Sequence, residues 1–520
     1  MRLASQIRDS FDFSSIGWSS SAGSEAAFGK RFPRGVLVAV SIFVLITTAL
    51  IGLISPSLGF KTPMELLLVI VLFFLVVKRP EWGLVFFLIL TSTLFVPEYF
   101  GKWSSDNTVY LAYEMVLILL VGRALLVRRE PTVTQTITAS PAAIALIAFA
   151  SIVVAKSLVF PIQERFTSHS IFTAFFFDRS LSLYLLFIPV LIFFNSVKRQ
   201  RWMVRAFLAL GAIVSTAAIF TALFPRNSIL GPLIASQSLQ SDSPTVALLV
   251  QRVRPPGGAL DLACFWVGLM NLLLRPWNRK RLALYVPLTL VTLAGVLLEF
   301  NRSYFIPIAV LAVLVMLLNR KNVRLKLISL FVVVTVAVLL FATATGTLQK
   351  YVGAIITRYG STFSSQTEST QSLSERDIED NFAWAAIRSS PAFGISLNDL
   401  YRPPVVGMSN DLRWYDHDAY AWIWIYFGMI GLAAFIAALA AVLLRGLFNW
   451  GKIRDPFLQA ALVGMMLALV TLAVADYVNP KFYEYQTVPV IALMMGLIEA
   501  IIIRHKQLLS GGQGAERRDD

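Results

Sequence analysis

Long apolar runs dominate the pattern of hydrophobic and polar positions along this chain. A membrane-spanning helix needs roughly 20 apolar residues, and runs of about that length recur between residues 35 and 504. The pattern predicts these fourteen spans: 35–54, 57–77, 82–96, 111–127, 140–160, 181–194, 203–224, 257–274, 284–300, 304–318, 325–346, 420–444, 457–475 and 487–503. We therefore expect an all-α polytopic membrane protein with about 12–14 transmembrane helices.

Polar segments divide the chain into five parts. Residues 1–34 and 505–520 are predicted to be cytoplasmic tails, and the first of them is rich in serine. Transmembrane helices are predicted in 35–346 and in 420–504. Residues 347–419 form the longest predicted connection, and an ordered loop of that length usually carries a function.

An amphipathic helix is predicted inside the long connection, at residues 374–389. Its start resembles a capping sequence, Ser374–Asp377, and Pro391 follows its end. Apolar side chains recur at the helical spacing i, i+4, i+7, i+8: Ile378, Phe382, Ala385 and Ala386. Such a helix can lie on the membrane surface or cover a cavity.

The composition agrees with a membrane protein and excludes several other classes. Hydrophobic residues make up 57% of the chain and charged residues only 14%, against about 25% charged in soluble domains. The single cysteine, Cys264, permits no internal disulfide and no zinc site built from thiolates. The sequence also lacks the nucleotide-binding GxxxxGK[ST] motif, the GxSxG nucleophile motif and the HExxH metal motif.

The net charge of +15 is explained by membrane orientation. If the N-terminus is cytoplasmic, the connections on that side hold basic clusters, as the positive-inside rule requires. These clusters include Lys30/Arg31/Arg34, Lys78/Arg79, Arg128/Arg129, Lys198/Arg199/Arg201, Arg279/Lys280/Arg281, Arg320/Lys321/Arg324/Lys326 and Arg445/Lys452/Arg454. An even number of spans then places both termini in the cytoplasm and 347–419 on the outer face. No nucleic-acid partner is needed to explain the charge.

His417 is the main candidate for chemistry among the three histidines. It lies in Trp414–Tyr420, directly before a span and on the predicted outer face. A histidine there suits general acid–base catalysis, because its ordinary pKa is near neutral. The alternative is an interfacial histidine among the Trp and Tyr residues that gather at membrane surfaces. The sequence leaves both interpretations open.

Two carboxylates flank this histidine, Asp416 and Asp418. Such a pair can hold Mg²⁺ or Mn²⁺, as in nucleotide-sugar transferases. The loop, however, faces away from the cytoplasm, where nucleotide sugars are made. We therefore favour a supporting role, in which a carboxylate orients His417, and predict no metal and no cofactor.

Arginines on the predicted outer face form the second signal. Arginine is costly near hydrocarbon, yet Arg302 lies in a very short turn between two spans, and Arg252 and Arg254 directly precede another span. Arg376 lies on the predicted amphipathic helix. Each of them can instead be solvated or paired with a nearby acid. Together they favour an anionic, lipid-linked substrate, because the guanidinium group binds two phosphate oxygens at once.

The order of these motifs resembles the O-antigen ligase and polymerase superfamily of bacterial envelope enzymes over about residues 247–438. Arg254-Pro255-Pro256-Gly257 leads into a span, and Arg302 separates two close spans. The long loop then carries Arg376, Trp384, Pro391–Gly394 and finally His417-Asp418-x-Tyr420, and Gly428-x-x-Gly431-Leu432 follows in the next span. The chain departs from the usual family pattern in two places, with Asp418 where Asn is common and Asn301 before the central arginine.

The resemblance implies a polyprenyl-diphosphate-linked glycan as donor, at the periplasmic face of the bacterial inner membrane. By motif position, Arg302 and one of Arg252 and Arg254 would hold the diphosphate, and His417 would assist the acceptor hydroxyl. Arg376, Asp416 and Asp418 would support them. The acceptor would be a glycan or a lipid, and polysaccharide assembly proteins would be partners. No cofactor and no nucleic acid is implied.

Three functions remain open from the sequence. The N-terminal spans and the divergent His-Asp pair favour a polymerase of exopolysaccharide type over an O-antigen ligase that acts on lipid A–core. The alternative from another class is a polysaccharide transporter or flippase. Transporters commonly carry internal repeats and sites near the middle of the bilayer, and the sequence shows no repeat and few charges within its spans.

Overall fold

The computed structural model describes residues 76, 78–92, 107–126, 136–163, 180–223, 258–299, 301–318, 323–329, 332, 367–397, 399–405 and 413–510. The chain divides into two compact units, Met1–Val71 and Leu72–Asp520, and all of the described residues belong to the second. The predicted span 35–54, nearly all of 57–77 and most of 325–346 lie outside them, as do both tails except for the start of the second.

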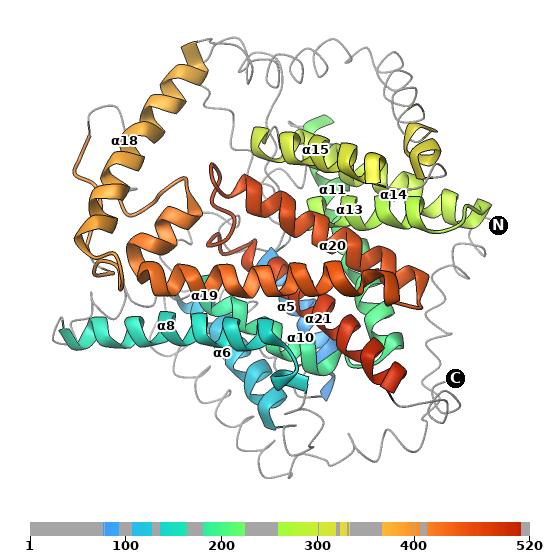
Figure 1. Cartoon of the computed structure of the whole chain (residues 1–520), viewed down its shortest axis with the longest axis horizontal. Helices are drawn as coiled ribbons and strands as arrows, with labels where there is room; N and C mark the ends of the chain where they lie inside the picture. Colours follow the sequence, from blue (N-terminus) through green and yellow to red (C-terminus); the bar gives the residue numbers. More distant parts are fainter. Residues whose placement is uncertain are drawn as a thin grey trace, which may run out of the picture. The chain divides into compact units, whose positions relative to one another are not determined.

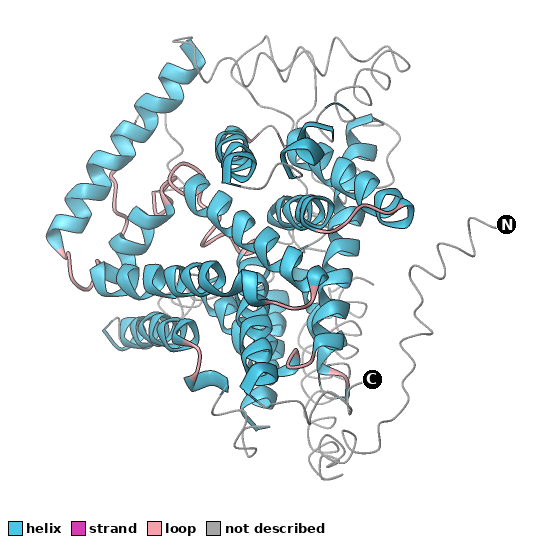
Figure 2. Ribbon diagram, turned by 45° about the vertical axis from the view of Figure 1, so that its right-hand side comes forward, coloured by secondary structure: helices cyan, strands magenta, loops and turns pink. Residues whose placement is uncertain are grey.

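Within the described residues, the regular structure is helical and no strand is present (Figure 2). The elements are α5 (Pro80–Ser92), α6 (Asn107–Leu126), α8 (Pro141–Gln163), η4 (Ser182–Leu186), α10 (Phe187–Phe193), α11 (Val197–Leu223), α13 (Gly258–Leu274), α14 (Arg279–Leu298), α15 (Arg302–Leu318), α18 (Thr367–Ser389), α19 (Ala419–Asn449), η6 (Trp450–Lys452), α20 (Pro456–Ala475) and α21 (Val488–Ser510).

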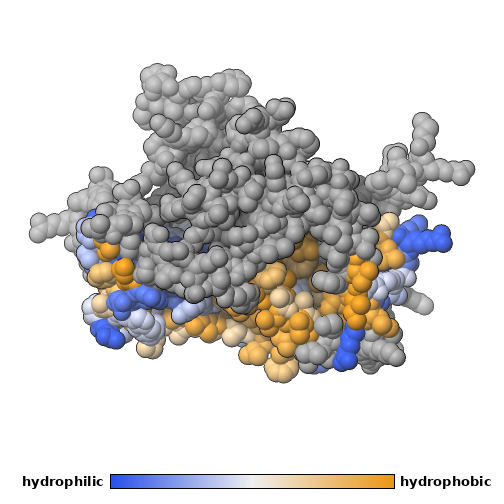
Figure 3. Space-filling view, turned by 90° about the horizontal axis from the view of Figure 1, so that it is seen from above, coloured by the Kyte–Doolittle hydropathy of each residue, from blue (hydrophilic) through white to orange (hydrophobic). Residues whose placement is uncertain are grey.

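The helices confirm the prediction of an all-α polytopic membrane protein. Six of the described helices are long and apolar enough to cross a membrane, and five shorter apolar helices accompany them. The remaining eleven predicted spans coincide with these helices, η4 and α10 together forming one. Figure 3 shows hydrophobic side chains over the middle of the visible described surface and hydrophilic ones at its two ends, the distribution expected of helices in a lipid bilayer. The orientation of the helices across the membrane stays a prediction.

Side-chain caps set where several helices begin. The carboxylate of Asp418 accepts hydrogen bonds from the backbone N–H groups of Tyr420 and Ala421 at the start of α19. Asp455 caps α20 in the same way, with Pro456 at the first helical position, and Asn278 caps α14. Aspartate and asparagine are preferred at these positions because they satisfy N–H groups that have no partner within the helix.

The core is built around α13, which contacts α20, α14 and α11. A buried hydrogen bond of 3.0 Å from Trp266 Nε1 to Thr471 Oγ1 joins α13 to α20. On another side α8 runs along α19 (Figure 1). At one end of these two helices Glu499 of α21 accepts a hydrogen bond from Ser140 and pairs with Arg445. These buried polar groups thus find partners on neighbouring helices, which lowers the cost of placing them in an apolar interior.

The helix predicted at 374–389 is longer than expected. It is α18, and it begins at Thr367, so Ser374–Asp377 lies inside the helix and is not its cap. The residues from 367 to 373 include no Gly or Pro to stop the helix. The end agrees with the prediction, because α18 finishes at Ser389, two residues before Pro391.

Candidate functional site

The structure pairs His417, which lies just before α19, with a carboxylate that projects from α18. Nδ1 of His417 lies 2.7 Å from Oε2 of Glu379, which projects from α18. The Glu379 side chain is only 5% exposed, whereas the His417 side chain is 41% exposed. His417 therefore has one ring nitrogen bound to a buried acid, while part of the ring reaches the surface.

This pairing sets the tautomer of the imidazole. An ionised carboxylate can only accept hydrogen bonds, so Nδ1 carries the proton and its N–H group donates a hydrogen bond to Glu379. Nε2 is then the nitrogen with a free lone pair, and it can take a proton from a substrate. The ring of Tyr415 packs edge-on against the imidazole, with 5.1 Å between the ring centres, and helps to hold its orientation.

The two neighbouring aspartates do not orient the histidine through a hydrogen bond in this structure; they organise the backbone around it. Oδ1 of Asp416 accepts the backbone N–H of Asp418 at 2.8 Å. Oδ2 of Asp416 is buried and has no hydrogen-bond partner among the described residues. Asp418 is the cap of α19. The orienting carboxylate that the sequence suggested is thus supplied by Glu379, 38 positions away from His417.

Burial and like charges perturb the acids of this cluster. Burial raises the pKa of Asp416 to about 8 against the opposing hydrogen bond from Asp418, and the charges of Glu379 and Asp418 add to the rise. Burial also raises the pKa of Asp418 to about 6, although the two N–H groups of the helix cap oppose it. A protonated Asp416 at neutral pH relieves the repulsion among these acids.

Glu379 was the residue that sequence reasoning missed as a partner for His417. In α18, the most buried side chains with described placement are Glu379, Ala383 and Ile387, which recur at i, i+4 and i+8. An acid on the buried stripe of a helix is unusual unless it is paired. The position of Glu379 on this stripe, in line with Ala383 and Ile387, was the sequence signal that could have identified it.

The arginine candidates are only partly placed. Arg376 lies half-buried on α18, and its charge acts on Asp380 four residues later. Arg302 is the first residue of α15, and α14 ends at Leu298, so the connection between the two helices is as short as predicted. Arg252 and Arg254 lie outside the described residues.

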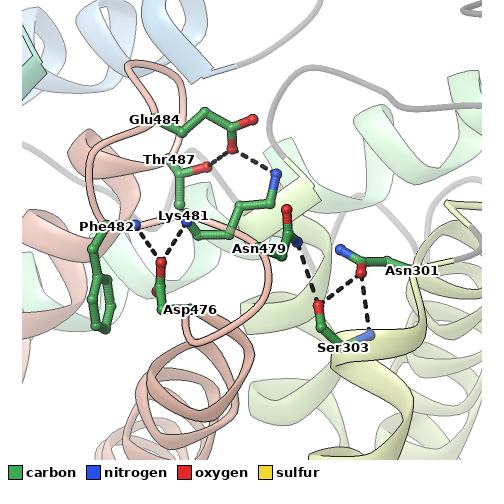
Figure 4. A network of polar contacts seen from close by, with 8 residues as sticks. All are labelled: Asn301, Ser303, Asp476, Asn479, Lys481, Phe482, Glu484 and Thr487. Atoms are coloured by element: carbon green, nitrogen blue, oxygen red, sulfur yellow. Dashed lines mark hydrogen bonds and ion pairs between the residues drawn. The ribbon is translucent and has the colours of Figure 1, made fainter. Parts of the chain in front are cut away.

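The loop between α20 and α21, residues 476–487, forms a polar network of its own (Figure 4). Asp476 Oδ1 accepts the backbone N–H groups of Lys481 at 2.5 Å and Phe482 at 2.9 Å. The Lys481 ammonium pairs with Glu484 at 2.6 Å, and Glu484 also accepts the hydroxyl of Thr487. These contacts hold the loop in a fixed shape.

This α20–α21 loop lies between the two candidate regions. On one side Asn479 Nδ2 is 3.4 Å from Ser303 Oγ, the residue next to Arg302 (Figure 4). On the other side Ala419 N–H donates to the backbone oxygen of Asp476 at 3.0 Å. The hydroxyl of Tyr483 donates to the backbone oxygen of Asp416 at 2.5 Å. The loop therefore connects the start of α15 with the segment that carries His417.

The described residues offer no group of three His, Cys, Asp or Glu side chains able to hold a metal ion. Oδ1 of Asp416 and Oδ1 of Asp418 both accept backbone N–H groups. With part of the His417 ring exposed, this arrangement can supply a general base.

Comparison with protein families agrees with the motif pattern. Residues 287–436 match the family described as O-antigen ligase. The match contains α18, His417, Glu379 and the first half of α19. No match was found among curated proteins. The matched region supports the resemblance of this chain to the O-antigen ligase/polymerase superfamily.

Proposed function

We propose that this protein is a glycosyltransferase of the bacterial inner membrane that moves a glycan from a polyprenyl-diphosphate donor at the periplasmic face. It would serve the synthesis of a surface polysaccharide. The observation that carries the proposal is the 2.7 Å contact between a partly exposed His417 and the buried Glu379, at the start of a span and inside the matched domain. Such a pair is the usual arrangement of a histidine base and its orienting acid.

The proposed reaction is a single displacement. The acceptor hydroxyl oxygen attacks the anomeric carbon of the donor glycan, and its proton passes to Nε2 of His417. The bond from the anomeric carbon to the diphosphate breaks, and the polyprenyl diphosphate leaves with the electron pair. Glu379 stabilises the imidazolium that forms, because its carboxylate already accepts a hydrogen bond from the Nδ1–H group.

The diphosphate would be held by arginines, with Arg302 at the start of α15 and one of Arg252 and Arg254. Guanidinium groups stabilise the charge that develops on the leaving diphosphate without a metal. Support for Arg302 comes from its position, because the α20–α21 loop contacts Ser303 on one side and the His417 segment on the other. Arg376 would add positive charge from α18.

Between the two enzyme activities, we propose a polymerase that joins repeat units, with ligation to lipid A–core as the alternative. The acceptor distinguishes them, since a polymerase accepts a second lipid-linked glycan and a ligase accepts a lipid A–core molecule. Both termini are proposed to be cytoplasmic, because the basic clusters then lie on the cytoplasmic side.

The test is transfer by purified protein in liposomes, with a defined lipid-linked donor, each acceptor in turn, a chelator and no ion gradient. We expect longer glycans with the wild type and a loss of roughly 10²–10⁴-fold in His417→Gln. His169→Gln, at a histidine outside the matched residues 287–436, is the control and should keep its activity. Arg302→Lys should lose most transfer, because lysine lacks the planar fork.

Two results would contradict the proposal. Wild-type protein that moves lipid-linked glycan across the bilayer without extending it would identify a transporter. Full transfer by His417→Gln would remove the base assignment and leave His417 as an interfacial residue.

A further inference from the structure

α19 is broken inside its membrane span. Gly428 has φ 69° and ψ −179°, a backbone conformation that is not helical and that only glycine adopts readily. The break removes the normal helical partners of the backbone groups on either side. Unpaired backbone groups are costly at membrane depth, so other segments must supply partners.

The segment after α18 supplies most of these partners. The backbone oxygen of Pro391 accepts the N–H of Met429 at 2.9 Å, and Ile395 N–H donates to the backbone oxygen of Ile425 at 2.8 Å. Trp424 Nε1 also donates to the Pro391 oxygen. The residues 391–395 thus fill the gap in α19, and we call them the inserted segment.

The inserted segment and α19 approach each other so closely that two positions have no room for a Cβ atom. Gly394 has φ 73°, and a Cβ there would overlap the backbone of Tyr426. A Cβ on Gly428 would overlap the carbonyl of Ala392. Two glycines, 34 positions apart in the sequence, therefore make one junction between α18 and α19.

Lys156 completes this junction from a third helix. Its ammonium group, projecting from α8, donates to the backbone oxygen of Phe393 at 2.6 Å and to that of Tyr426 at 2.5 Å. One carbonyl belongs to the inserted segment and the other to the broken helix. The charge of Asp399 attracts the same ammonium. A lysine that merely reaches for the membrane surface would not need to bind two carbonyls from different segments.

The junction sets the position of α18 against the segment that carries His417. The inserted segment begins two residues after Ser389, the end of α18, and α19 begins two residues after His417. Glu379 on α18 therefore reaches His417 at a distance that depends on how 391–395 is seated. Trp384 of α18 and Trp424 of α19 also meet edge-on, 5.7 Å between ring centres.

We propose that Lys156 is a positioning residue for the transfer reaction: it fastens the inserted segment into the break of α19 and so holds Glu379 against His417. The inference rests on the proposed function for its catalytic consequence, but its structural part stands without it. Lys156 lies outside the matched domain of residues 287–436, and it acts through the backbone without touching the substrate.

The experiment combines hydrogen exchange with kinetics on the full-length protein in detergent. Lys156→Met keeps the length of the side chain and removes the donor. The variant loses the hydrogen bonds from the ammonium to the carbonyls of Phe393 and Tyr426. The amides of Met429 and Ile430 donate to Pro391 and Ala392 of the inserted segment, and we expect them to exchange about tenfold faster or more. The kcat for transfer should fall while the KM for the donor stays near that of the wild type. Lys156→Arg should restore both readouts in part.

Lys506→Met is the matched control, because Lys506 is an exposed lysine at the end of α21, and neither readout should change. If Lys156→Met does not accumulate, Lys156→Gln serves as the second variant, with a smaller expected rise in exchange. Unchanged exchange at Met429 and Ile430 in these variants overturns the inference. Faster exchange in a protein whose wild type transfers no glycan would retain the fastening role and reject the proposed function instead.

Discussion

The junction between α18 and α19 and the loop between α20 and α21 hold their backbones in opposite ways. Lys156 at the junction binds carbonyls 237 and 270 positions away, and His417, just before α19, binds an acid of α18 that is 38 positions away. In the α20–α21 loop, Asp476, Lys481 and Glu484 bind groups three to six positions away. One region is held by distant segments and the other mostly by its own residues.

The difference predicts which substitutions should most disturb the geometry of the candidate site. A network closed within a dozen residues forms as soon as the loop folds, because the entropy of closing a short loop is small. A junction of three distant segments forms only when all of them are packed. Substitutions at the junction should therefore disturb the His417 site more than substitutions in the loop.

Among the substitutions that test this comparison, the largest expected effect is on activity, from Glu379→Gln on α18. The amide of glutamine can donate to Nδ1 and so favour the tautomer that lacks a free lone pair on Nε2. We expect kcat to fall by roughly 10²-fold or more, as in triads whose orienting acid is replaced by its amide. The measurement is transfer from a lipid-linked donor. Asp377→Asn removes an exposed acid from the same helix and should leave kcat unchanged; equal losses in both variants would reject the orienting role.

The next effect is on stability, from Gly428→Ala. Alanine at φ 69° and ψ −179° costs about 1–3 kcal/mol in backbone strain, and its Cβ also overlaps the Ala392 carbonyl. We expect a clear fall in the thermal unfolding midpoint in detergent. Gly122→Ala is the control, because nothing lies within 4 Å of a Cβ placed there, and its midpoint should hold or rise. Similar midpoints in the two variants would mean that α19 straightens without penalty.

A smaller effect is expected from Asp476→Ala in the α20–α21 loop. The change leaves the N–H groups of Lys481 and Phe482 without their acceptor and should cost about 1–3 kcal/mol. Because the network is local, we expect a lower unfolding midpoint but nearly normal transfer per folded molecule. A loss of kcat as large as that of Glu379→Gln would show that the loop shapes the site as strongly as the junction does.

The smallest effect concerns pH, and Asp416→Asn measures it. The folded-state pKa of Asp416 is raised to about 8 from an ordinary value near 3.8. Below about pH 4 the residue is protonated in both states, whereas between pH 4 and 8 only the folded state keeps the proton. Stability attributable to this group therefore falls as pH rises through that window, and the cost is complete above about pH 8. Asp416→Asn should flatten this decline, so its midpoint should exceed that of the wild type more at pH 8.5 than at pH 5. An equal difference at both pH values would contradict the raised pKa.

Much of the fold was predictable because it depends on local composition. The apolar runs marked eleven of the described helices, and Pro391 marks the end of α18 that the structure confirms closely. The start of α18 was misplaced, since a capping sequence at Ser374 also occurs inside helices. His417 and the two aspartates were found as a motif, but the motif contained no information about Glu379.

The sequence by itself determined the membrane class, the order of the helices and the residue types able to perform acid–base chemistry, because each follows from composition and short-range spacing. The tertiary structure alone decided which acid binds His417, how the gap at Gly428 is filled, and that Lys156 of α8 fastens both sides of it. These depend on contacts between segments 34 to 270 positions apart. No local pattern encodes such contacts, since backbone groups freed by a break accept partners from whichever segment packs against them.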